Sequence, residues 1–280
     1  MTNLETYVYW IKERESIRLK KEQGLPKPWT DDPILQNYRF CNVEREKDTV
    51  SIWINANWIL PNDNDQNMWF AMIVARLFNW PPTLYEIGYP KLINQSFKQW
   101  LEDIRFNLKG LRDDKGAKIF TGAYLVSTNG VKMDKIDYIL DRVLTPIWEK
   151  GRGPRENESL ESYWNYLLQF DGLGSFMAGQ VIADLKYTSP LKDASDWWDW
   201  APLGPGSIRG LNRFHGRPVD KTLKQDQGLL EICEAQKLIE NELGWLLPAH
   251  NIQNTFCEYY KYCKIKYGEG RTRSRYQGVK

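Results

Sequence analysis

Apolar residues recur at helical spacing over most of the chain. Residues 67–80 are apolar on nearly every side, which predicts a buried core helix that stops at Pro81 and Pro82. Segment 117–128 fits either a strand or a helix. Further helical patterns cover residues 5–23, 93–109, 133–149, 159–170, 174–186, 228–246 and 248–266. The sequence therefore predicts a mostly α-helical protein, one domain over 1–280 with two lobes near 1–150 and 151–280.

A glycine-containing turn lies between two of these predicted helices, 159–170 and 174–186. Its residues are Gly172, Leu173, Gly174 and Ser175. Glycine has no Cβ, so the backbone can turn tightly and approach a phosphate, which the amides and dipole of the second helix attract. The pattern predicts a helix-hairpin-helix, spanning 159–186, that binds DNA. A plain helix corner, in which glycine only caps the first helix, is the alternative.

Three aspartates stand among tryptophans downstream of this turn, in the stretch "DASDWWDW" (193–200). A carboxylate beside large apolar rings is poorly solvated, so its pKa shifts or its charge acts strongly on a nearby cation. Asp196 and Asp199 are therefore candidate catalytic residues, and Trp197 and Trp200 are candidate walls of a base pocket. The alternative is that the aspartates cap helices and the tryptophans belong to the core.

Arginines follow these carboxylates along the chain. Ser207 lies in a glycine- and proline-rich loop, and Arg209, Arg213 and Arg217 come after it with no acidic residue among them. Arginine side chains at a helix start can clamp phosphate groups. The pattern predicts that Ser207, Arg209 and Arg213 bind DNA.

The C-terminal segment 261–280 is also basic, with Glu269 as its one acidic residue. Such a segment is often simply solvated. Beside a DNA-binding hairpin it indicates a non-specific grip on phosphates, to which Lys264 and Arg271 would contribute.

Polar residues cluster in the segment 39–48, interleaved with apolar ones. A buried asparagine or arginine is costly unless it is hydrogen-bonded, so the cluster indicates either a binding site or an ion-pair network that ties the N-terminal part together. In the first case Asn42 would contact a base edge. The residues expected to line the base pocket are Arg39, Phe40, Asn42, Arg45, Thr121, Tyr124, Trp197 and Trp200.

Composition adds few constraints. The chain carries 38 basic and 36 acidic residues, so its overall charge does not select a partner. No apolar run is long enough to cross a membrane, and the N-terminus does not read as a signal peptide. Four cysteines without paired spacing indicate free thiols and a cytoplasmic location. We expect no metal and no cofactor, and no Walker-type G-x-x-x-x-G-K-[ST] loop is present.

Four segments together resemble one family. They are "KPWTDDPILQNYRFCNVERE" (27–46), "FTGAY" (120–124), "WAPLGPGSIRGLNR" (200–213) and "CEYYKYCKIKYGEGR" (257–271), and they resemble the alpha-glutamyl/putrescinyl-thymine pyrophosphorylase family of DNA-hypermodification proteins. This resemblance implies a helix-hairpin-helix DNA glycosylase-like fold and DNA with modified pyrimidines as the substrate. Some members resemble transferases, and a bacterial member resembles an anti-phage glycosylase that excises glucosylated 5-hydroxymethylcytosine.

The resulting expectation is a monofunctional DNA glycosylase. It would flip a bulky modified pyrimidine of phage DNA into a pocket, and Asp196 or Asp199 would stabilise the oxocarbenium ion and orient water. The hairpin carries no lysine, so an abasic product without strand cleavage is expected. We expect a monomer that acts in antiviral defence.

Two alternatives remain open. One is a transferase that places an amino acid on a phosphorylated 5-hydroxymethyl pyrimidine, with arginines on the leaving phosphate and an aspartate that deprotonates the amine. The other is a non-catalytic reader of modified DNA. The sequence does not define the modification that is recognised, because the shape of a pocket is a tertiary property.

Overall fold

The structure, a computed structural model, describes residues 1–92, 96–121 and 126–270. The described part is mostly helical and contains no strand, which confirms the expected fold class. No helix in these ranges has both the length and the apolar character needed to cross a membrane. The finer expectation of a glycosylase-like arrangement stays a prediction.

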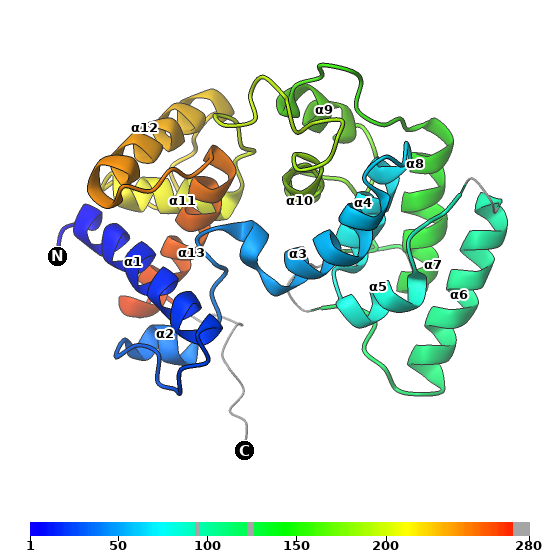
Figure 1. The fold of residues 1–280 in the computed structure, drawn as a ribbon, viewed down its shortest axis with the longest axis horizontal. Coiled ribbons are helices and arrows are strands. Elements are labelled where there is room, and N and C mark those ends of the chain that lie inside the picture. Colours follow the sequence, from blue (N-terminus) through cyan, green and yellow to red (C-terminus); the bar gives the residue numbers. More distant parts are fainter. Residues whose placement is uncertain (93–95, 122–125, 271–280) are drawn as a thin grey trace. The chain divides into compact units, whose positions relative to one another are not determined.

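The chain divides into two compact units. The terminal unit combines Met1–Asp48 with Trp198–Lys280, and the central unit is Thr49–Trp197. This division differs from the expected lobes 1–150 and 151–280, because both ends of the chain pack into one unit. In Figure 1 the helices of the terminal unit carry the colours of both chain ends, and those of the central unit carry the colours in between.

The terminal unit is built from helices of both chain ends. Its elements are α1 (Asn3–Glu22), α2 (Pro33–Asn37), the 3₁₀ turn η1 (Arg45–Lys47), α11 (Pro205–Phe214), α12 (Gln225–Leu243) and α13 (Ala249–Lys266). Tyr7 of α1 stacks on Phe256 of α13 with 4.5 Å between ring centroids, and its hydroxyl lies 2.6 Å from Oγ1 of Thr255. The apolar face of α1 therefore covers α11 and α13 and closes one core.

Two glycines allow α11 to pack closely on α13. A Cβ at Gly206 would lie 2.4 Å from Sγ of Cys257, and one at Gly210 would lie 2.1 Å from the carbonyl oxygen of Phe256. These distances are far below van der Waals contact, so only glycine permits this helix spacing. Gly206 and Gly210 of the "GPGSIRG" stretch thus serve helix packing.

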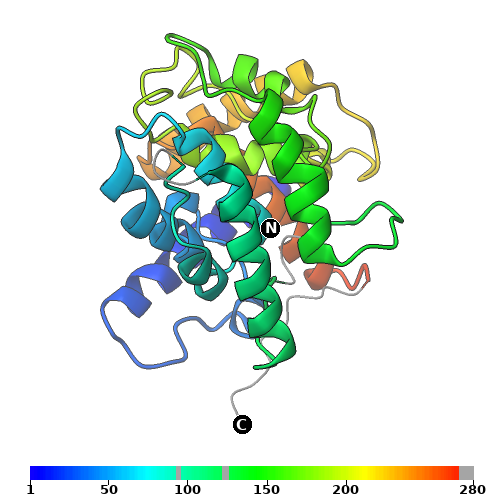
Figure 2. The ribbon, with the colours of Figure 1, turned by 90° about the vertical axis from the view of Figure 1, so that its right-hand side faces the viewer.

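The central unit contains the other helices. They are α3 (Thr49–Ile54), the π-helix η2 (Asn55–Ile59), the 3₁₀ turn η3 (Leu60–Asn62), α4 (Met68–Phe78), α5 (Pro81–Ile87), α6 (Phe97–Asp113), α7 (Lys135–Asp137), the π-helix η4 (Tyr138–Leu144), α8 (Thr145–Lys150), α9 (Leu160–Leu167) and α10 (Ser175–Leu185). Every residue of α4 is buried, as its all-round apolar pattern predicts. Figure 2 shows α6 beside the α7–α8 segment.

Departures from the expected helices have local causes. Pro81 and Pro82 begin α5, since proline suits the first turn of a helix. Helix α4 ends at Phe78, and its C-cap residue Asn79 has a left-handed φ of 47°. The predicted helix 133–149 contains the π-helical η4 just before Pro146, which has no N–H to donate. The described parts of segment 117–128 are neither strand nor helix.

Candidate nucleic-acid interface

The glycine turn of the central unit connects α9 to α10. Leu173 is fully buried and anchors the turn, and its amide donates to the carbonyl of Phe170. Gly172 has φ +88°, and a Cβ there would lie 2.7 Å from a methyl carbon of Val143 in η4. Both the backbone conformation and the contact therefore require glycine at this position. Two helices joined by a glycine turn are present, which both the predicted helix-hairpin-helix and the alternative of a plain helix corner require. The DNA-binding role of the turn remains a prediction.

The start of α10 is open to solvent. Gly174 is the N-cap and is exposed, and no atom lies within 4 Å of a Cβ built on it. Within the described chain no side chain caps this helix start, so first-turn amides such as those of Ser175 and Met177 have no intrahelical acceptor. The indole of Trp164 donates to the carbonyl of Ser175 at 3.2 Å and ties the turn to α9. The space in front of Gly174 leaves room for an anion at this helix start.

A buried ion pair, which was not among the predicted features, joins α10 to α4. The guanidinium of Arg76 donates to both carboxylate oxygens of Asp184, and it also reaches Asn79 at 3.1 Å and Ser51 at 3.0 Å. Arg76 is only 2% exposed. A single cation in an otherwise apolar helix needs a buried partner. The position of Arg76 within the apolar run 67–80 was therefore the signal in the sequence that indicated a buried ion pair.

Asp196 lies in the central unit and is held by backbone amides. Its two carboxylate oxygens accept from the N–H of Leu160 at 2.7 Å and of Glu161 at 2.9 Å. These are first-turn amides of α9, so the carboxylate satisfies the helix start in the way that the capping alternative describes. Its expected catalytic role stays a prediction, and its geometry favours a structural one.

Asp199 belongs to the terminal unit and is exposed. Its carbonyl lies 3.4 Å from Sγ of Cys233 in α12. Burial raises the pKa of the Cys233 thiol, and the nearby Asp199 charge raises it further. Asp199 therefore presents a carboxylate to solvent, whereas both oxygens of Asp196 are bound.

The two tryptophans expected to line a pocket have different surroundings. Trp197 donates its indole N–H to the carbonyl of Lys186 at 2.7 Å, and the Lys186 ammonium lies 3.6 Å from the Trp197 ring centroid. Trp200 is 2% exposed and contacts His250 edge to face at 5.7 Å. In the terminal unit, Trp200 thus forms part of the packed interior.

Ser207 is buried and bonded within its own unit. Its hydroxyl accepts from the amide of Gly204 at 3.0 Å and from Nε2 of Gln253 at 3.1 Å. A hydroxyl with no exposed surface has no direct path to a phosphate. The observed contacts of Ser207 thus stabilise the start of α11.

Acidic residues distant in the sequence partner two of the three arginines. Arg213 pairs with Glu269, and Arg217 makes two hydrogen bonds of 2.6 Å to Glu231. Arg209 is exposed, and its guanidinium lies 5.8 Å from the ring centroid of Tyr260. The absence of acids between these arginines along the chain therefore did not predict their electrostatic surroundings.

The segment 39–48 forms a hydrogen-bonded network in the terminal unit. The Asn42 side chain accepts from Arg14 and donates to the carbonyl of Lys47 at 2.6 Å, while its amide donates to Asp48 at 2.8 Å. Burial raises the pKa of the Asp48 carboxyl. Asn42 is thus engaged within the fold, as the network alternative describes.

The neighbouring pocket candidates have distinct exposures. Phe40 is nearly buried against Trp10, and Arg39 is exposed. Arg45 is half-buried, and its amide donates to the side chain of Asn251 at 3.2 Å. Of this group, Arg39 has the side chain most accessible to a ligand.

Several predicted residues lie elsewhere. Thr121 of the central unit is half-buried in an irregular segment, and Lys264 is half-buried near the end of α13. Tyr124 and Arg271 lie outside the described residues. All four cysteines are free thiols, as expected, and the described ranges hold no cluster of His, Cys, Asp and Glu side chains suited to a metal ion.

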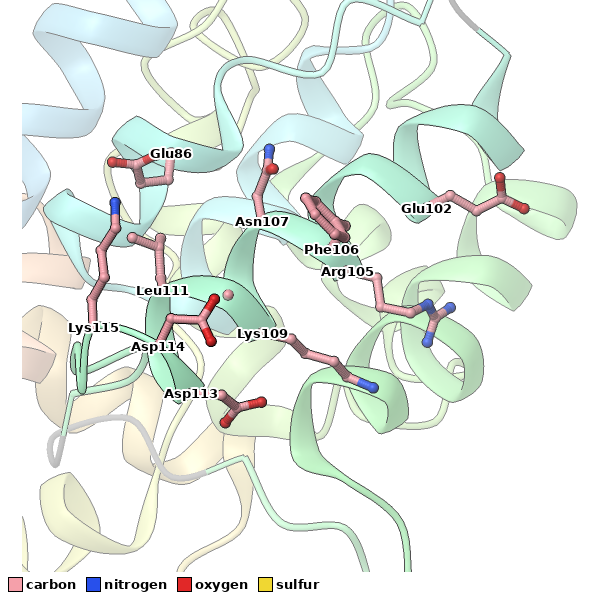
Figure 3. A pocket seen from close by; sticks show the side chains of 11 residues that line it. Glu86, Glu102, Arg105, Phe106, Asn107, Lys109, Leu111, Asp113, Asp114 and Lys115 are labelled. Carbon is pink, nitrogen blue, oxygen red and sulfur yellow. The ribbon is translucent and has the colours of Figure 1, made fainter.

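An open groove of about 760 Å³ runs along α6, and the sequence analysis named none of its residues. Figure 3 shows side chains of both charges around it, including Glu86, Arg105 and Lys109. Arg105 and Lys109 already donate to Asp141 and Asp137, respectively, at 2.6 and 2.7 Å. The groove therefore offers little net attraction for a phosphate.

Two comparisons with known proteins match this chain. The family described as "5-hmdU DNA kinase, helical domain" matches residues 2–272. The 5-hmdU DNA kinase of Bacillus phage SP10 is 28% identical over 231 residues, which cover 74% of this chain and 35% of the phage protein. The chain thus spans about a third of the length of that relative. No solved structure matches it.

These matches correct the expected reaction class. A kinase is a transferase, so the expectation of a monofunctional glycosylase that hydrolyses DNA to an abasic site is wrong. The broader expectation, a protein of DNA hypermodification, is confirmed, while the particular subfamily suggested by the sequence stays a prediction. Since the match extends over residues 2–272, the chain belongs to the family of the helical domain of 5-hmdU DNA kinases.

Proposed function

We propose that this chain binds DNA containing a 5-hydroxymethyl pyrimidine and presents that nucleotide for group transfer at its 5-hydroxymethyl group. The observation that carries the proposal is the family match over residues 2–272. The phage relative is named for phosphorylation of 5-hmdU in DNA, which is a transfer to this type of substituent. The transferase alternative of the sequence analysis has the same reaction class.

The open start of α10 supports the DNA-binding part of the proposal. Gly174 leaves space in front of amides that lack intrahelical acceptors, and Gly172 fixes the turn against Val143. A DNA phosphate would accept from these amides and interact favourably with the helix dipole. In the terminal unit, Arg209 and Lys264 would add phosphate contacts that do not depend on sequence.

Asp199 is the better placed of the two predicted catalytic carboxylates. Both oxygens of Asp196 accept amides of α9, whereas Asp199 is exposed. In the proposed reaction the hydroxyl of the 5-hydroxymethyl group attacks the donor, and Asp199 would accept the proton that this hydroxyl loses. Asp196 would position α9. Exchange of Asp199 for asparagine should then stop transfer while DNA binding persists.

No known motif of this sequence binds the donor of the transferred group. A Walker-type phosphate loop is absent from the sequence, and the phage relative extends well beyond the matched region. We therefore assign to this chain the binding of DNA and the proton transfer, and leave the binding of a nucleoside triphosphate to another protein segment.

Binding and mass analysis of DNA test the proposal together. Two duplexes are compared that are identical except that one has thymidine where the other has 5-hydroxymethyldeoxyuridine. The chain should bind the modified duplex severalfold more tightly. After incubation with a nucleoside triphosphate and the longer phage relative, digested DNA should yield more of an intact nucleoside of higher mass when this chain is added than when the relative acts alone. Equal binding of both duplexes, or release of a free base with alkali-labile sites, would contradict the proposal.

A further inference from the structure

Cations and tyrosines lie beside one another on the surface of α11 and of the C-terminal part of α13 in the terminal unit. We call this surface the cation–tyrosine ridge; its residues are Arg209, Arg213, Tyr260, Lys264, Lys266 and Tyr267. Arg209 and Arg213 are four residues apart on α11, so they lie on the same side of the helix. Tyr260 and Lys264 have the same spacing on α13. The close packing of α11 on α13 joins the two rows.

Direct contacts connect the cations to the rings. The guanidinium of Arg213 lies 5.4 Å from the ring centroid of Tyr267, and the ammonium of Lys266 lies 5.8 Å from the same centroid. Arg209 is 5.8 Å from the centroid of Tyr260. Tyr267 is 51% exposed, so much of its ring remains accessible. Cation contacts of this kind hold a ring in place.

The ridge carries excess positive charge. Arg209, Lys264 and Lys266 make no ion pair within the described ranges, and Arg213 pairs with Glu269. The Glu269 side chain is itself 43% exposed, so a stronger anion could displace it. Charge complementarity therefore favours a polyanion as the ligand of this face.

We propose that the cation–tyrosine ridge binds single-stranded DNA. Bases would stack on Tyr260 and Tyr267, phosphates would contact the neighbouring cations, and a phosphate would replace Glu269 on Arg213. The proposal takes DNA as the ligand class from the proposed function, but it concerns a different surface from the start of α10. Stacking requires unpaired bases, so a paired duplex would gain only the phosphate contacts.

The spacing of the rings suits two nucleotides. Tyr260 and Tyr267 are seven residues apart at the end of α13, which corresponds to about 10 Å along a helix axis. Stacked bases of one strand are about 3.4 Å apart, so the two rings would contact different, non-adjacent bases. A stretched strand meets that geometry more readily than a stacked one.

Fluorescence anisotropy with a labelled oligothymidylate and a thymidine–adenosine duplex of equal length tests the ridge. Tyr267→Leu should weaken single-strand binding about tenfold and duplex binding less than about twofold. Arg209→Gln should reduce the slope of log K against log salt by about 0.7. Matched controls are Tyr85→Leu, an exposed tyrosine of the central unit, and Lys237→Gln on α12; both should bind as the wild type does.

A gain of affinity separates this proposal from loss of folding. Glu269→Gln removes the competing carboxylate, so single-strand binding should strengthen about threefold at low salt and return to the wild-type value at high salt. Unchanged or weaker binding by this variant, or equal losses in Tyr267→Leu and Tyr85→Leu, would overturn the ridge as a single-strand site. The oligonucleotides carry no modified base, so failure of the proposed group transfer would leave this test unaffected.

Discussion

Two helices of this protein begin with similar glycine-containing sequences, one in each unit. In the central unit, "GLGSF" leads into α10, and in the terminal unit, "LGPGS" leads into α11. The start of α10 is open, since Gly174 and Ser175 are exposed and no side chain of the described chain caps it. The start of α11 is closed, because Ser207 is buried and Gly206 meets Cys257.

The comparison separates two uses of glycine. At α11 glycine lets one helix approach another, and the amide of Gly204 and the hydroxyl of Ser207 are hydrogen-bonded inside the unit. At the turn before α10, Gly172 fixes the backbone conformation while Gly174 leaves room in front of the amides. In the second arrangement the residues at the helix start are exposed, so an external anion can reach its amides.

The largest effect is expected where α10 is anchored to α4. Asp184→Asn would leave the Arg76 guanidinium buried without its counter-charge, so the free energy of unfolding of the central unit should fall by about 3–5 kcal/mol. Urea unfolding monitored by tryptophan fluorescence measures the loss. The double variant Arg76→Met/Asp184→Leu should recover most of it, and a single-variant loss below about 1 kcal/mol would show that the pair does not anchor the helix.

A pH dependence of opposite sign is expected in the two units. Arg152 donates two hydrogen bonds to Glu158, just before α9, and holds the pKa of that carboxyl at about 2, below its ordinary value. Because the folded pKa is depressed, this stabilisation is present above the unfolded pKa and is lost as the pH falls from about 5 towards 2. It amounts to about 3 kcal/mol. Glu158→Gln should remove it at pH 7.

Asp48 supplies the contrasting case in the terminal unit. Burial raises the pKa of this carboxyl, so its contribution to folding becomes less favourable as the pH rises through its unfolded pKa. Asp48→Asn should therefore relieve a cost at pH 7, whereas Glu158→Gln should impose one. Unfolding curves between pH 3 and about 8 distinguish the two; parallel profiles for both variants would contradict these assignments.

A smaller loss is expected from the packed glycine of α11. A Cβ in Gly210→Ala would meet the carbonyl of Phe256, which is backbone and cannot rotate away, so the helices must separate. We expect a loss of about 2–3 kcal/mol in the terminal unit. Circular dichroism during thermal unfolding would detect it. Gly174→Ala on α10 is the matched variant, and its Cβ meets nothing within 4 Å.

The smallest stability effect separates the two glycines of the α9–α10 turn. Gly172→Ala places a side chain at φ +88° and against Val143, so it should cost about 2 kcal/mol. Gly174 has φ −58°, which any residue adopts, and its replacement by alanine should cost less than about 1 kcal/mol. Val143→Ala should rescue only the steric part of the Gly172→Ala loss. Equal losses at both positions would show that the turn geometry is not the cause.

Local sequence patterns predicted the longer helices of this fold but not the short helices α2, α3 and α5. The burial of α4 follows from its continuous apolar run, and the turn between α9 and α10 follows from its glycines. Both patterns are local in the sequence, so the buried helix and the turn could be predicted. The division into units could not, because it depends on the packing of α1 against α11 and α13 across most of the chain.

The candidate site was less accessible to sequence reasoning because its electrostatics are tertiary. Arg213 is paired with Glu269, which follows it by more than fifty residues, and Asp196 accepts amides of a helix that precedes it. The tryptophans illustrate the same limit: Trp200 is core and Trp197 holds Lys186. Residue types indicate which chemistry is available, whereas the fold decides which groups remain unpaired.

The most direct test of the account is a carboxylate placed at the start of each helix. Aspartate is a favourable N-cap, and neither Gly174 nor Gly204 has an atom within 4 Å of a Cβ, so both Gly174→Asp and Gly204→Asp should fold with wild-type stability. Binding to a duplex that contains 5-hydroxymethyldeoxyuridine is then compared by anisotropy. We predict that Gly174→Asp weakens binding about tenfold or more through repulsion of the phosphate, while Gly204→Asp stays within about twofold of the wild type. Wild-type affinity in a folded Gly174→Asp variant would contradict the assignment of the α10 start to DNA.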